Sequence, residues 1–419
     1  MKVLVVADTY SPDVNGASTF AQRFAAGLTA RHEVHVLAPA RRWRSGSAVV
    51  AVAPGRALVE HRVRALPVVA GGTGLRFCPP AGLGRAVDAV LRRVRPDVVH
   101  VQSHFLLGRA AVAAARRAGV PVVATNHFMP ENLTHHVPLG ARAQRRLHAW
   151  AWADAARVFA GADVVTAPTP FAARLAESSG VPGPVLPVSC GLDLSRFSPD
   201  ADGSRRRVFR TRYGVPDRPT FAYVGRLAPE KNVHELVDAL ALLHRARPEL
   251  DAQLLLVGDG AERRGLLARA ARAGVADRVV TTGFVPEEDL PAAYAAADAF
   301  VNAGTAELQS LVVLEAMASG LPVLGVAAGA LPHLVHEGRN GHLFPHGEPA
   351  VLADRLGALL GAGAAARAAR MGRCSREVAA AHDLAATLAR FEELYGALLR
   401  PADVRAGSAA AVASAGMAA

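Results

Sequence analysis

The strongest constraint on the fold is an alternation of short apolar runs with longer helical stretches, which occurs twice along the 419 residues. Strands are predicted in the first half at 3–7, 34–38, 97–101, 120–125, 162–167 and 185–188. Helical stretches at 17–30 and 110–118 lie between them. Strands that are apolar throughout and alternate with helices are typical of a parallel sheet covered on both faces. The first half therefore predicts an α/β domain.

The pattern restarts after a polar segment, residues 198–218, which we interpret as the domain boundary. Strands are predicted in the second half at 221–224, 253–257, 279–282, 299–301 and 322–325, with helices at 233–245, 261–273, 290–296 and 311–319. We expect a first domain at 1–200, a second at 215–381, a last helix at 382–400 that packs back on the first domain, and a disordered tail at 401–419. Ligands bind at the carboxyl ends of parallel strands, so two such domains facing each other create one cleft for two substrates.

The composition excludes several other classes of protein. No apolar run reaches the roughly 18 to 20 residues of a membrane-spanning helix, and the first eight residues indicate a buried strand rather than a signal peptide. Cys78, Cys190 and Cys374 are odd in number and far apart, which argues against a disulfide framework and against a zinc site. We therefore expect a cytoplasmic protein, with the inner face of the membrane as a further option.

The charge is unevenly distributed along the chain. The net charge is +11, and residues 1–200 carry all of it, with 23 Lys and Arg against 12 Asp and Glu, whereas the remainder holds 24 of each. This excess indicates an anionic partner for the first half, such as a membrane surface, a phosphorylated acceptor or nucleic acid. A basic face that only meets solvent is an equal alternative. Nucleic-acid binding is the weaker option because no known binding module is present.

A first candidate for chemistry is the segment 224–232, which follows a predicted strand and precedes a helix. It contains Gly225, Arg226 and Lys231, and Lys231 is one of only two lysines against 45 arginines. Two fixed cations can neutralise the charge that develops on a departing pyrophosphate, and they can do so without a metal. The alternative is a surface loop with ordinary charges.

The second candidate is the segment 307–320. Ser310 is a suitable N-cap for a helix that begins at Leu311, so the free amides near Leu311 and Val312 predict an anion site. Glu307 precedes this site, and Glu315 lies inside an otherwise apolar helix. A buried carboxylate is costly unless it is hydrogen-bonded, and carboxylates suit the paired hydroxyls of a sugar or ribose. The alternative is that Glu315 faces solvent and Glu307 only caps the helix.

These segments together resemble glycosyltransferase family 4, the retaining enzymes of GT-B fold, over roughly residues 2–400. The resemblance rests on the spacing of Glu307 and Glu315 with the following 316–323, on the Gly-Arg-x5-Lys segment 225–231, and on the Gly-x-Asp-x3-Phe-x-Pro stretch 191–199. It implies two Rossmann-like domains whose parallel sheets face each other across a cleft. It also implies a hexosyltransferase that takes its sugar from a nucleotide-diphosphate donor.

The resemblance further implies roles for individual residues. Arg226 and Lys231 would hold the donor pyrophosphate, Glu307 would bind hydroxyls of the transferred sugar, and Glu315 would bind the ribose. The remaining donor contacts that it implies are His127 at the sugar, Asn15 and Gly16 under the phosphates, Gly225 beside Arg226, the backbone at Phe284 and Val285 for the base, and Leu308, Gln309, Ser310, Leu311 and Val312 around the helix start.

The sequence departs from the family pattern at two places. The usual Gly-Phe-Gly between the two glutamates is Leu308-Gln309-Ser310, and the glycine pair of the first loop is Asn15-Gly16. The first variant resembles members with lipid acceptors. The stretch 142–157 combines arginines with Trp150 and Trp152, which suits a membrane interface or an acceptor phosphate, although a helix packed by its tryptophans is an equal reading.

The sequence predicts neither a cofactor nor a metal site. His100, His104, His127, His135, His136 and His148 fit no standard ligand spacing. Because no first-domain carboxylate other than Asp13 presents itself as a nucleophile, we expect same-face substitution with retention. The reaction would move a hexose from a GDP-mannose or UDP-glucose type donor to a lipid, glycan or small-molecule hydroxyl. The alternatives are a sugar-nucleotide epimerase or hydrolase of the same fold and a noncatalytic partner subunit.

Overall fold

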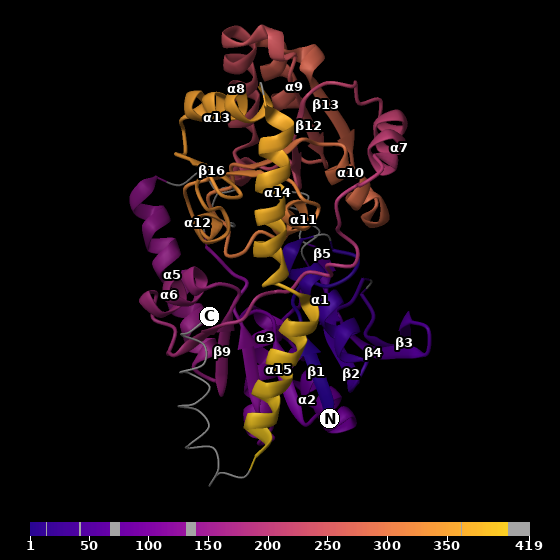
Figure 1. The fold of residues 1–419 in the computed structure, drawn as a ribbon. Coiled ribbons are helices and arrows are strands. Elements are labelled where there is room, and N and C mark those ends of the chain that lie inside the picture. Colours follow the sequence, from indigo (N-terminus) through magenta and orange to yellow (C-terminus); the bar gives the residue numbers. More distant parts are fainter. Residues whose placement is uncertain (14, 42, 68–75, 131–139, 362, 401–419) are drawn as a thin grey trace. The chain divides into compact units, whose positions relative to one another are not determined.

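The computed structural model describes residues 1–13, 15–41, 43–67, 76–130, 140–361 and 363–400. The predicted tail 401–419, His135 and His136 lie outside these residues. The chain forms two compact units, and both appear in Figure 1. Unit 1 consists of Met1–Gly191 together with the chain from Leu384 onward, and unit 2 consists of Leu192–Asp383.

Unit 1 is built on an eight-stranded sheet with the order β10-β9-β8-β7-β1-β2-β4-β3. The strands are β1 (Lys2–Val6), β2 (Glu33–Pro39), β3 (Gly46–Ala53), β4 (Arg56–Val63), β7 (Val98–Val101), β8 (Val122–Thr125), β9 (Val164–Ala167) and β10 (Val185–Pro187). The helices are α1 (Gly16–Leu28), α2 (Leu83–Val94), α3 (Leu106–Arg117), α5 (Ala141–Phe159), α6 (Pro170–Ser178) and α15 (Leu384–Leu399). All neighbouring strands are parallel except β3, which pairs antiparallel with β4.

The central strand and the helix that follows it explain this arrangement. Val3 to Val6 of β1 are fully buried, as a strand covered on both faces requires. The Asn15 side chain then accepts a hydrogen bond from the Ser18 amide at 2.9 Å and caps α1. Because the cap fixes where α1 begins, Phe20 and Phe24 face the core.

Helix α15 belongs to unit 1 although it ends the described chain, and Figure 1 shows it beside α1. The Phe391 ring lies 5.0 Å from the Phe24 ring, edge to face. The Tyr395 hydroxyl lies 2.6 Å from Nδ1 of the buried His100. Burial of a large apolar side chain contributes about 1.5–3 kcal/mol. The two buried aromatic side chains therefore stabilise the docked helix by more than its hydrogen bond does.

Unit 2 has a six-stranded sheet with the order β13-β12-β11-β14-β15-β16, and its strand pairs are all parallel. The strands are β11 (Thr220–Val224), β12 (Gln253–Val257), β13 (Val279–Gly283), β14 (Ala299–Asn302), β15 (Val323–Val326) and β16 (Gly341–Phe344). The helices are α7 (Ser204–Tyr213), α8 (Val233–Ala246), α9 (Arg263–Arg272), α10 (Leu290–Ala295), α11 (Leu311–Ala318), α12 (Leu331–Leu334), α13 (Pro349–Leu360) and α14 (Ala364–Ala380).

The polar segment 198–218 differs from the prediction because it contains α7. This helix packs within unit 2 through the buried Phe209 and Arg210. The Arg210 guanidinium donates to the carbonyl oxygens of Pro216 and Ala296, at 2.6 and 2.8 Å, and to the Thr220 hydroxyl at 2.8 Å. A buried arginine is tolerated when its donors are used in this way. The polar segment is therefore a structural part of unit 2.

Candidate active site

The loop that leaves β11 carries the first pair of predicted residues. Gly225 has φ 147°, a conformation that favours glycine, and a side chain at the neighbouring Gly258 would come within 2.0 Å of the Gly225 carbonyl oxygen. The Arg226 carbonyl oxygen accepts a hydrogen bond from the Tyr223 hydroxyl at 2.9 Å. The Arg226 guanidinium pairs with Glu230 at 2.8 Å and remains 42% exposed. The loop thus holds one arginine at the carboxyl end of a central strand, with its charge accessible.

Lys231 joins the two predicted segments. It lies at the end of the short helical turn Pro229–Lys231, and its Nζ is 2.7 Å from Oε1 of Glu307. The lysine and glutamate side chains are 22% and 12% exposed. A charge-assisted hydrogen bond of this length fixes both groups relative to each other. The structure therefore brings segment 224–232 into contact with segment 307–315. The two paired residues are 76 positions apart in the sequence.

Two residues that sequence reasoning missed shape the loop around Glu307. The Asn302 amide at the end of β14 accepts from the Gly304 amide at 2.8 Å and donates to the Ser310 hydroxyl at 3.0 Å. A β-carbon at Gly304 would lie 3.0 Å from Oε1 of Glu307 and 3.5 Å from Cδ of Lys231. Gly304 is therefore the residue that leaves room for the ion pair.

Ser310 occupies the N-cap position of α11, but its side chain does not cap the helix. Within the described chain its hydroxyl makes no hydrogen bond to the first turn, and its partner is Asn302. Ser310 therefore has the predicted N-cap position, but without a side-chain capping bond. The physical reason is competition, because a buried amide on the adjacent strand offers the hydroxyl a bond that also orders the preceding loop. Leu311 and Val312 begin the helix, and both are partly exposed.

Glu315 is buried inside α11, so the alternative in which it faces solvent is wrong. Its residue is 4% exposed, and Oε2 accepts a hydrogen bond from the Tyr294 hydroxyl at 2.8 Å. Tyr294 lies on α10 and is itself fully buried. Tyr294 gives no signal in the sequence, because its role depends on α10 packing beside α11. A neutral hydroxyl therefore donates to this buried carboxylate.

The other predicted donor contacts occupy two further places in unit 2. Leu308 is buried, and the Gln309 amide lies 3.3 Å from Nδ1 of His382. Phe284 follows β13 with 67% of its surface exposed, whereas Val285 is buried. An exposed aromatic ring at a strand end is a suitable surface for a planar base.

The charges of this site are close to balanced in the absence of a ligand. Each of its two cations is paired with one carboxylate, Arg226 with Glu230 and Lys231 with Glu307. Glu230 is 1% exposed, and among the described residues its Oε2 has no hydrogen-bond partner. Such an unpaired buried oxygen is costly, and the bond to Arg226 is made by the other carboxylate oxygen, Oε1. Glu230 was missed in the sequence, although its spacing of four from Arg226 was a usable signal.

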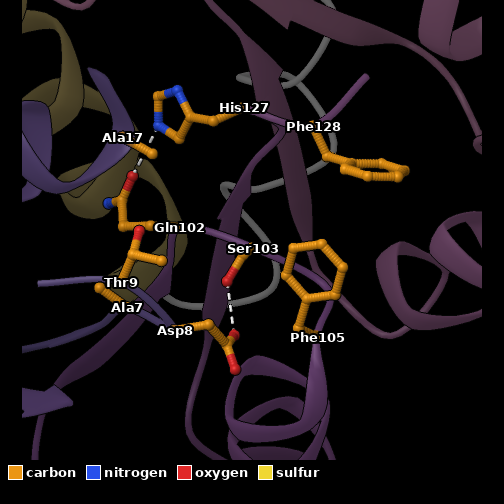
Figure 2. Close-up of a pocket in the computed structure, with 9 residues that line it drawn as sticks. All are labelled: Ala7, Asp8, Thr9, Ala17, Gln102, Ser103, Phe105, His127 and Phe128. Atoms are coloured by element: carbon orange, nitrogen blue, oxygen red, sulfur yellow. Dashed lines mark hydrogen bonds between the residues drawn. The ribbon is translucent and has the colours of Figure 1, made fainter. Parts of the chain in front are cut away.

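Unit 1 contributes a pocket at the carboxyl ends of β1 and β7, drawn in Figure 2. The cavity is about 80 Å³. It is lined by Ala7, Asp8, Thr9, Ala17, Gln102, Ser103, Phe105, His127 and Phe128. The Asp8 carboxylate accepts from the Ser103 hydroxyl at 2.5 Å and from the amides of Leu107 and Gly108 at 2.9 and 3.1 Å. Burial nevertheless raises the pKa of Asp8.

His127 lies in this pocket with its ring held on two sides. Nε2 is 3.0 Å from Oε1 of Gln102, and the ring packs against Phe20 with centroids 4.8 Å apart. Burial lowers the pKa of His127 to about 4, so the imidazole is neutral at pH 7. Within the described chain, Nδ2 of Asn126 and Nε2 of Gln102 have no partner, which leaves donors for a ligand. Gln102 was not singled out in the sequence.

Asn15 and Gly16 begin α1 in the same unit. The Asn15 side chain serves as the helix cap, as described above, and a β-carbon at Gly16 would meet no atom within 4 Å. The helix start is therefore open to a ligand. Asp13, the carboxylate considered as a nucleophile, is 7% exposed and lies 3.6 Å from Nε of Arg76.

Two further histidines, His100 and His104, take structural positions. His100 bonds Tyr395 and Thr125, and His104 packs against Phe105, Phe128 and Phe159. In the described part of the chain, no group of three or more His, Cys, Asp or Glu side chains is arranged to hold a metal ion. Over the same residues, no helix is both long and apolar enough to cross a membrane.

Comparison with known proteins identifies the family. Residues 14–196 match Glycosyltransferase Family 4, and residues 218–362 match Glycosyl transferases group 1. A GDP-mannose-dependent alpha-mannosyltransferase of Mycobacterium tuberculosis is 34% identical over 362 residues, which are 83% of this chain and 85% of that protein. A GDP-mannose-dependent alpha-(1-6)-phosphatidylinositol monomannoside mannosyltransferase of Mycolicibacterium smegmatis is 30% identical and covers 89% of this chain and 92% of its own.

Solved structures agree on the fold. The sucrose-phosphate synthase of Thermosynechococcus elongatus superposes with a TM-score of 0.73 at 23% identity, over 95% of this chain and 99% of that one. WaaG, a glycosyltransferase involved in lipopolysaccharide biosynthesis, superposes with a TM-score of 0.67 at 19% identity, over 94% and 99%. The predicted GT-B fold is thus confirmed. With its two matched segments and with relatives of 30% identity or more over most of its length, the chain belongs to glycosyltransferase family 4 and is a hexosyltransferase.

Proposed function

We propose that this enzyme transfers a hexose, mannose from GDP-mannose in the first instance, to a hydroxyl acceptor with retention of configuration and without a metal ion. The observation that carries this proposal is the contact between Lys231 and Glu307, which sets a cation and a carboxylate side by side at the start of α11. The sugar nucleotide has the two complementary features. Its anionic pyrophosphate suits the cation, and the hydroxyl groups of its sugar ring suit the carboxylate. Relatives named for GDP-mannose support the choice of donor.

Each of the unit 2 site residues named above then has one role. Arg226 and Lys231 bind the pyrophosphate, and Lys231 exchanges part of its contact with Glu307 for the donor phosphate. The Glu307 carboxylate that is released from this contact accepts hydrogen bonds from sugar hydroxyls. Glu315 accepts from the ribose hydroxyls while Tyr294 keeps its orientation. The ligand thus replaces internal ion pairs with external ones, so the site pays no large desolvation cost.

The chemical step uses the same groups. The bond between the sugar anomeric carbon and the β-phosphate oxygen breaks, and the electron pair goes to the phosphate. The acceptor oxygen bonds to the same face of the anomeric carbon, and its proton passes to a phosphate oxygen. Arg226 and Lys231 stabilise the charge that grows on the departing nucleotide. The His127 imidazole is neutral at pH 7 because burial lowers its pKa to about 4, so its proposed role is that of a hydrogen-bonding group and not of a cation.

The acceptor is a lipid, glycan or small-molecule hydroxyl. Relatives named for inositol phosphate and for phosphatidylinositol mannoside acceptors make a phosphorylated polyol the first class to test. A β-linked product from an α-linked donor, seen by NMR, would contradict retention. Activity that disappears with EDTA and returns with a divalent metal ion would contradict the metal-free mechanism.

The donor is tested first by thermal shift of the full chain with GDP-mannose, UDP-glucose and an ADP-sugar. A true donor raises the melting temperature by mass action, because it binds only the folded protein. We expect GDP-mannose to give the largest shift and Lys231→Ala to abolish it. Lys2→Ala is the matched control, since it removes the other lysine, which pairs with Glu33 in unit 1. Equal shifts in both variants, or donor consumption without any acceptor, would overturn the proposal.

A further inference from the structure

A cluster of arginines lies outside the residues used so far. It consists of Arg41, Arg64, Arg76 and the neighbouring Trp43, and we call it the arginine cluster. Arg41 follows β2, Arg64 follows β4, and Arg76 lies on the short strand β6 (Arg76–Phe77), which pairs with β5 (Leu66–Pro67). Because β2 and β4 are parallel and pair up to Pro39 and Val63, both arginines leave the sheet at its carboxyl edge. This is the edge at which open α/β sheets bind ligands.

Hydrogen bonds and a cation–π contact connect the members of the cluster. Arg76 donates to the Arg41 carbonyl oxygen at 2.9 Å, and Arg41 donates to the Ser11 hydroxyl at 3.3 Å. Arg64 lies over the Trp43 ring, 4.3 Å from its centroid. Ser11 belongs to the loop between β1 and α1, so the cluster borders the same loop that carries Asn15 and Gly16.

The charges of the cluster are under-compensated. Within the described chain, no carboxylate pairs with Arg41 or Arg64, and Arg76 has only Asp13 at 3.6 Å. The neighbouring Arg62 differs, because Glu60 accepts from both its Nε and its terminal nitrogen at 2.9 and 2.6 Å. Moreover, Nε of Arg76 is buried without a hydrogen-bond partner among the described residues. This nitrogen faces Oδ1 of Asp13 at 3.6 Å, which is beyond hydrogen-bond length, so an anionic oxygen of a ligand could still bond to it.

We propose that the arginine cluster binds a phosphate group carried by the acceptor substrate. This inference rests on the proposed function, since it assigns the chemistry of the acceptor at the carboxyl edge of unit 1. Guanidinium groups bind the oxygens of a phosphate through paired hydrogen bonds. The Trp43 ring under the Arg64 guanidinium orients that group. The proposal also gives three of the 23 basic residues in 1–200 a specific role.

The shared chemistry is a phosphate ester, and it has two sources, a soluble phosphorylated polyol or a lipid headgroup. Glycerol 3-phosphate represents the first source, with glycerol as its uncharged control. Vesicles of phosphatidylcholine with and without phosphatidylglycerol represent the second. Binding is followed by tryptophan emission, with Trp43→Phe to show that the signal comes from the cluster. The three tryptophans of the chain are Trp43, Trp150 and Trp152.

The test compares Arg41→Gln/Arg64→Gln with Arg56→Gln. Arg56 is the matched control because it is exposed at the opposite end of β4, and within the described chain no carboxylate pairs with it. We expect glycerol 3-phosphate to bind and glycerol not to bind, and we expect the double variant to weaken binding about tenfold or more, as loss of charge-assisted hydrogen bonds predicts. Arg56→Gln should bind like the natural chain. Vesicle binding that requires phosphatidylglycerol would assign the phosphate to a lipid, and binding of glycerol 3-phosphate alone would assign it to a soluble acceptor.

Equal binding by the double variant and Arg56→Gln would overturn the inference, as would no binding of either phosphate source. The donor thermal shift, measured on the same samples, separates this failure from that of the proposed function. A donor shift without phosphate binding would contradict only the arginine cluster. Phosphate binding without a donor shift would contradict only the proposed function.

Discussion

Glu307 and Glu315 are held by different partners, and this difference separates their effects. Glu307 contacts a cation, Lys231, whereas Glu315 accepts from the neutral hydroxyl of Tyr294. The sequence indicated both residues and the nearby cations through their spacing. It could not indicate Tyr294, Asn302 or Gly304, because these matter only through contacts between elements that are distant along the chain. Nor could it reveal that the Ser310 hydroxyl bonds Asn302 instead of the first turn of α11.

The first prediction concerns the two glutamates. Glu315→Gln should weaken GDP and GDP-mannose to the same extent, because the ribose is common to both. Glu307→Gln should weaken only GDP-mannose, because its proposed contact is with the sugar. Each loss should be about tenfold, from about 1–3 kcal/mol for a hydrogen bond to a charged group. Calorimetric titration of both ligands decides the matter, and equal losses for both ligands in Glu307→Gln would contradict the assignment.

The second prediction concerns the support of Glu315. Tyr294→Phe removes the hydroxyl that bonds Oε2 and leaves a buried carboxylate with one donor fewer. We expect the free energy of unfolding to fall by about 1–3 kcal/mol and GDP affinity to fall as well. The control is Tyr213→Phe, whose hydroxyl bonds Asp289 at the partly exposed end of α7. Denaturant titration should show a clearly smaller loss for this control. Similar losses of unfolding free energy in both variants would contradict a particular contribution of the bond between Tyr294 and Glu315.

At the scale of elements, the buried parallel strands could be predicted because they are apolar throughout, and β12 matches its predicted range. The hairpin of β3 and β4 was not predicted, since β3 exposes apolar residues such as Val49 and lacks a core-facing pattern. Helix α7 was missed because arginines dominate it and its anchor is a buried arginine. In both cases the sequence lacks the periodicity on which such predictions depend, and tertiary contacts decide the structure.

The third prediction tests how the loop after β14 makes room for the Lys231–Glu307 pair. Gly304→Ala places a methyl group 3.0 Å from Oε1 of Glu307, so the ion pair must shift by a few tenths of an ångström. We expect kcat/KM for transfer to fall about tenfold or more, because displaced catalytic groups lose transition-state stabilisation. The free energy of unfolding should change little.

Gly265→Ala is the matched control for this substitution. Gly265 lies inside α9, and a β-carbon there would meet nothing within 4 Å. Alanine in a helix interior should therefore stabilise the protein by about 0.5–1 kcal/mol and leave transfer unchanged. If Gly304→Ala behaved like Gly265→Ala in the transfer assay, Gly304 would have no part in holding the ion pair.

At the scale of the whole molecule, the buried histidines make acid stability a property of unit 1. Burial lowers the pKa of His61, His104 and His127 to about 4 and that of His100 to about 3. All four lie in unit 1, whereas in unit 2 burial lowers the pKa of His382. Burial also raises the pKa of Asp8 and Asp13, which favours the folded state in acid and offsets part of the effect.

The sign of the pH dependence follows from these shifts. An unfolded histidine takes up its proton near pH 6.5, whereas the folded ones resist protonation until about pH 4. Their contribution to stability is therefore complete above pH 6.5 and is lost as the pH falls toward 4. As the pH falls from 6.5 to 5, each buried histidine lowers the free energy of unfolding by about 1–2 kcal/mol. The total is a large fraction of the stability of a single domain, which is about 5–15 kcal/mol.

The last prediction uses the position of the tryptophans. Because Trp43, Trp150 and Trp152 all belong to unit 1, tryptophan emission reports the unfolding of that unit, whereas circular dichroism reports both. Lowering the pH from 7 to 5 should reduce the urea midpoint seen by emission more than the midpoint seen by dichroism. His104→Phe keeps an aromatic ring against Phe128 and should shrink the emission shift, while His346→Gln, at an exposed position, should leave it unchanged. An emission midpoint that is the same at both pH values would show that the buried histidines do not govern the acid stability of unit 1.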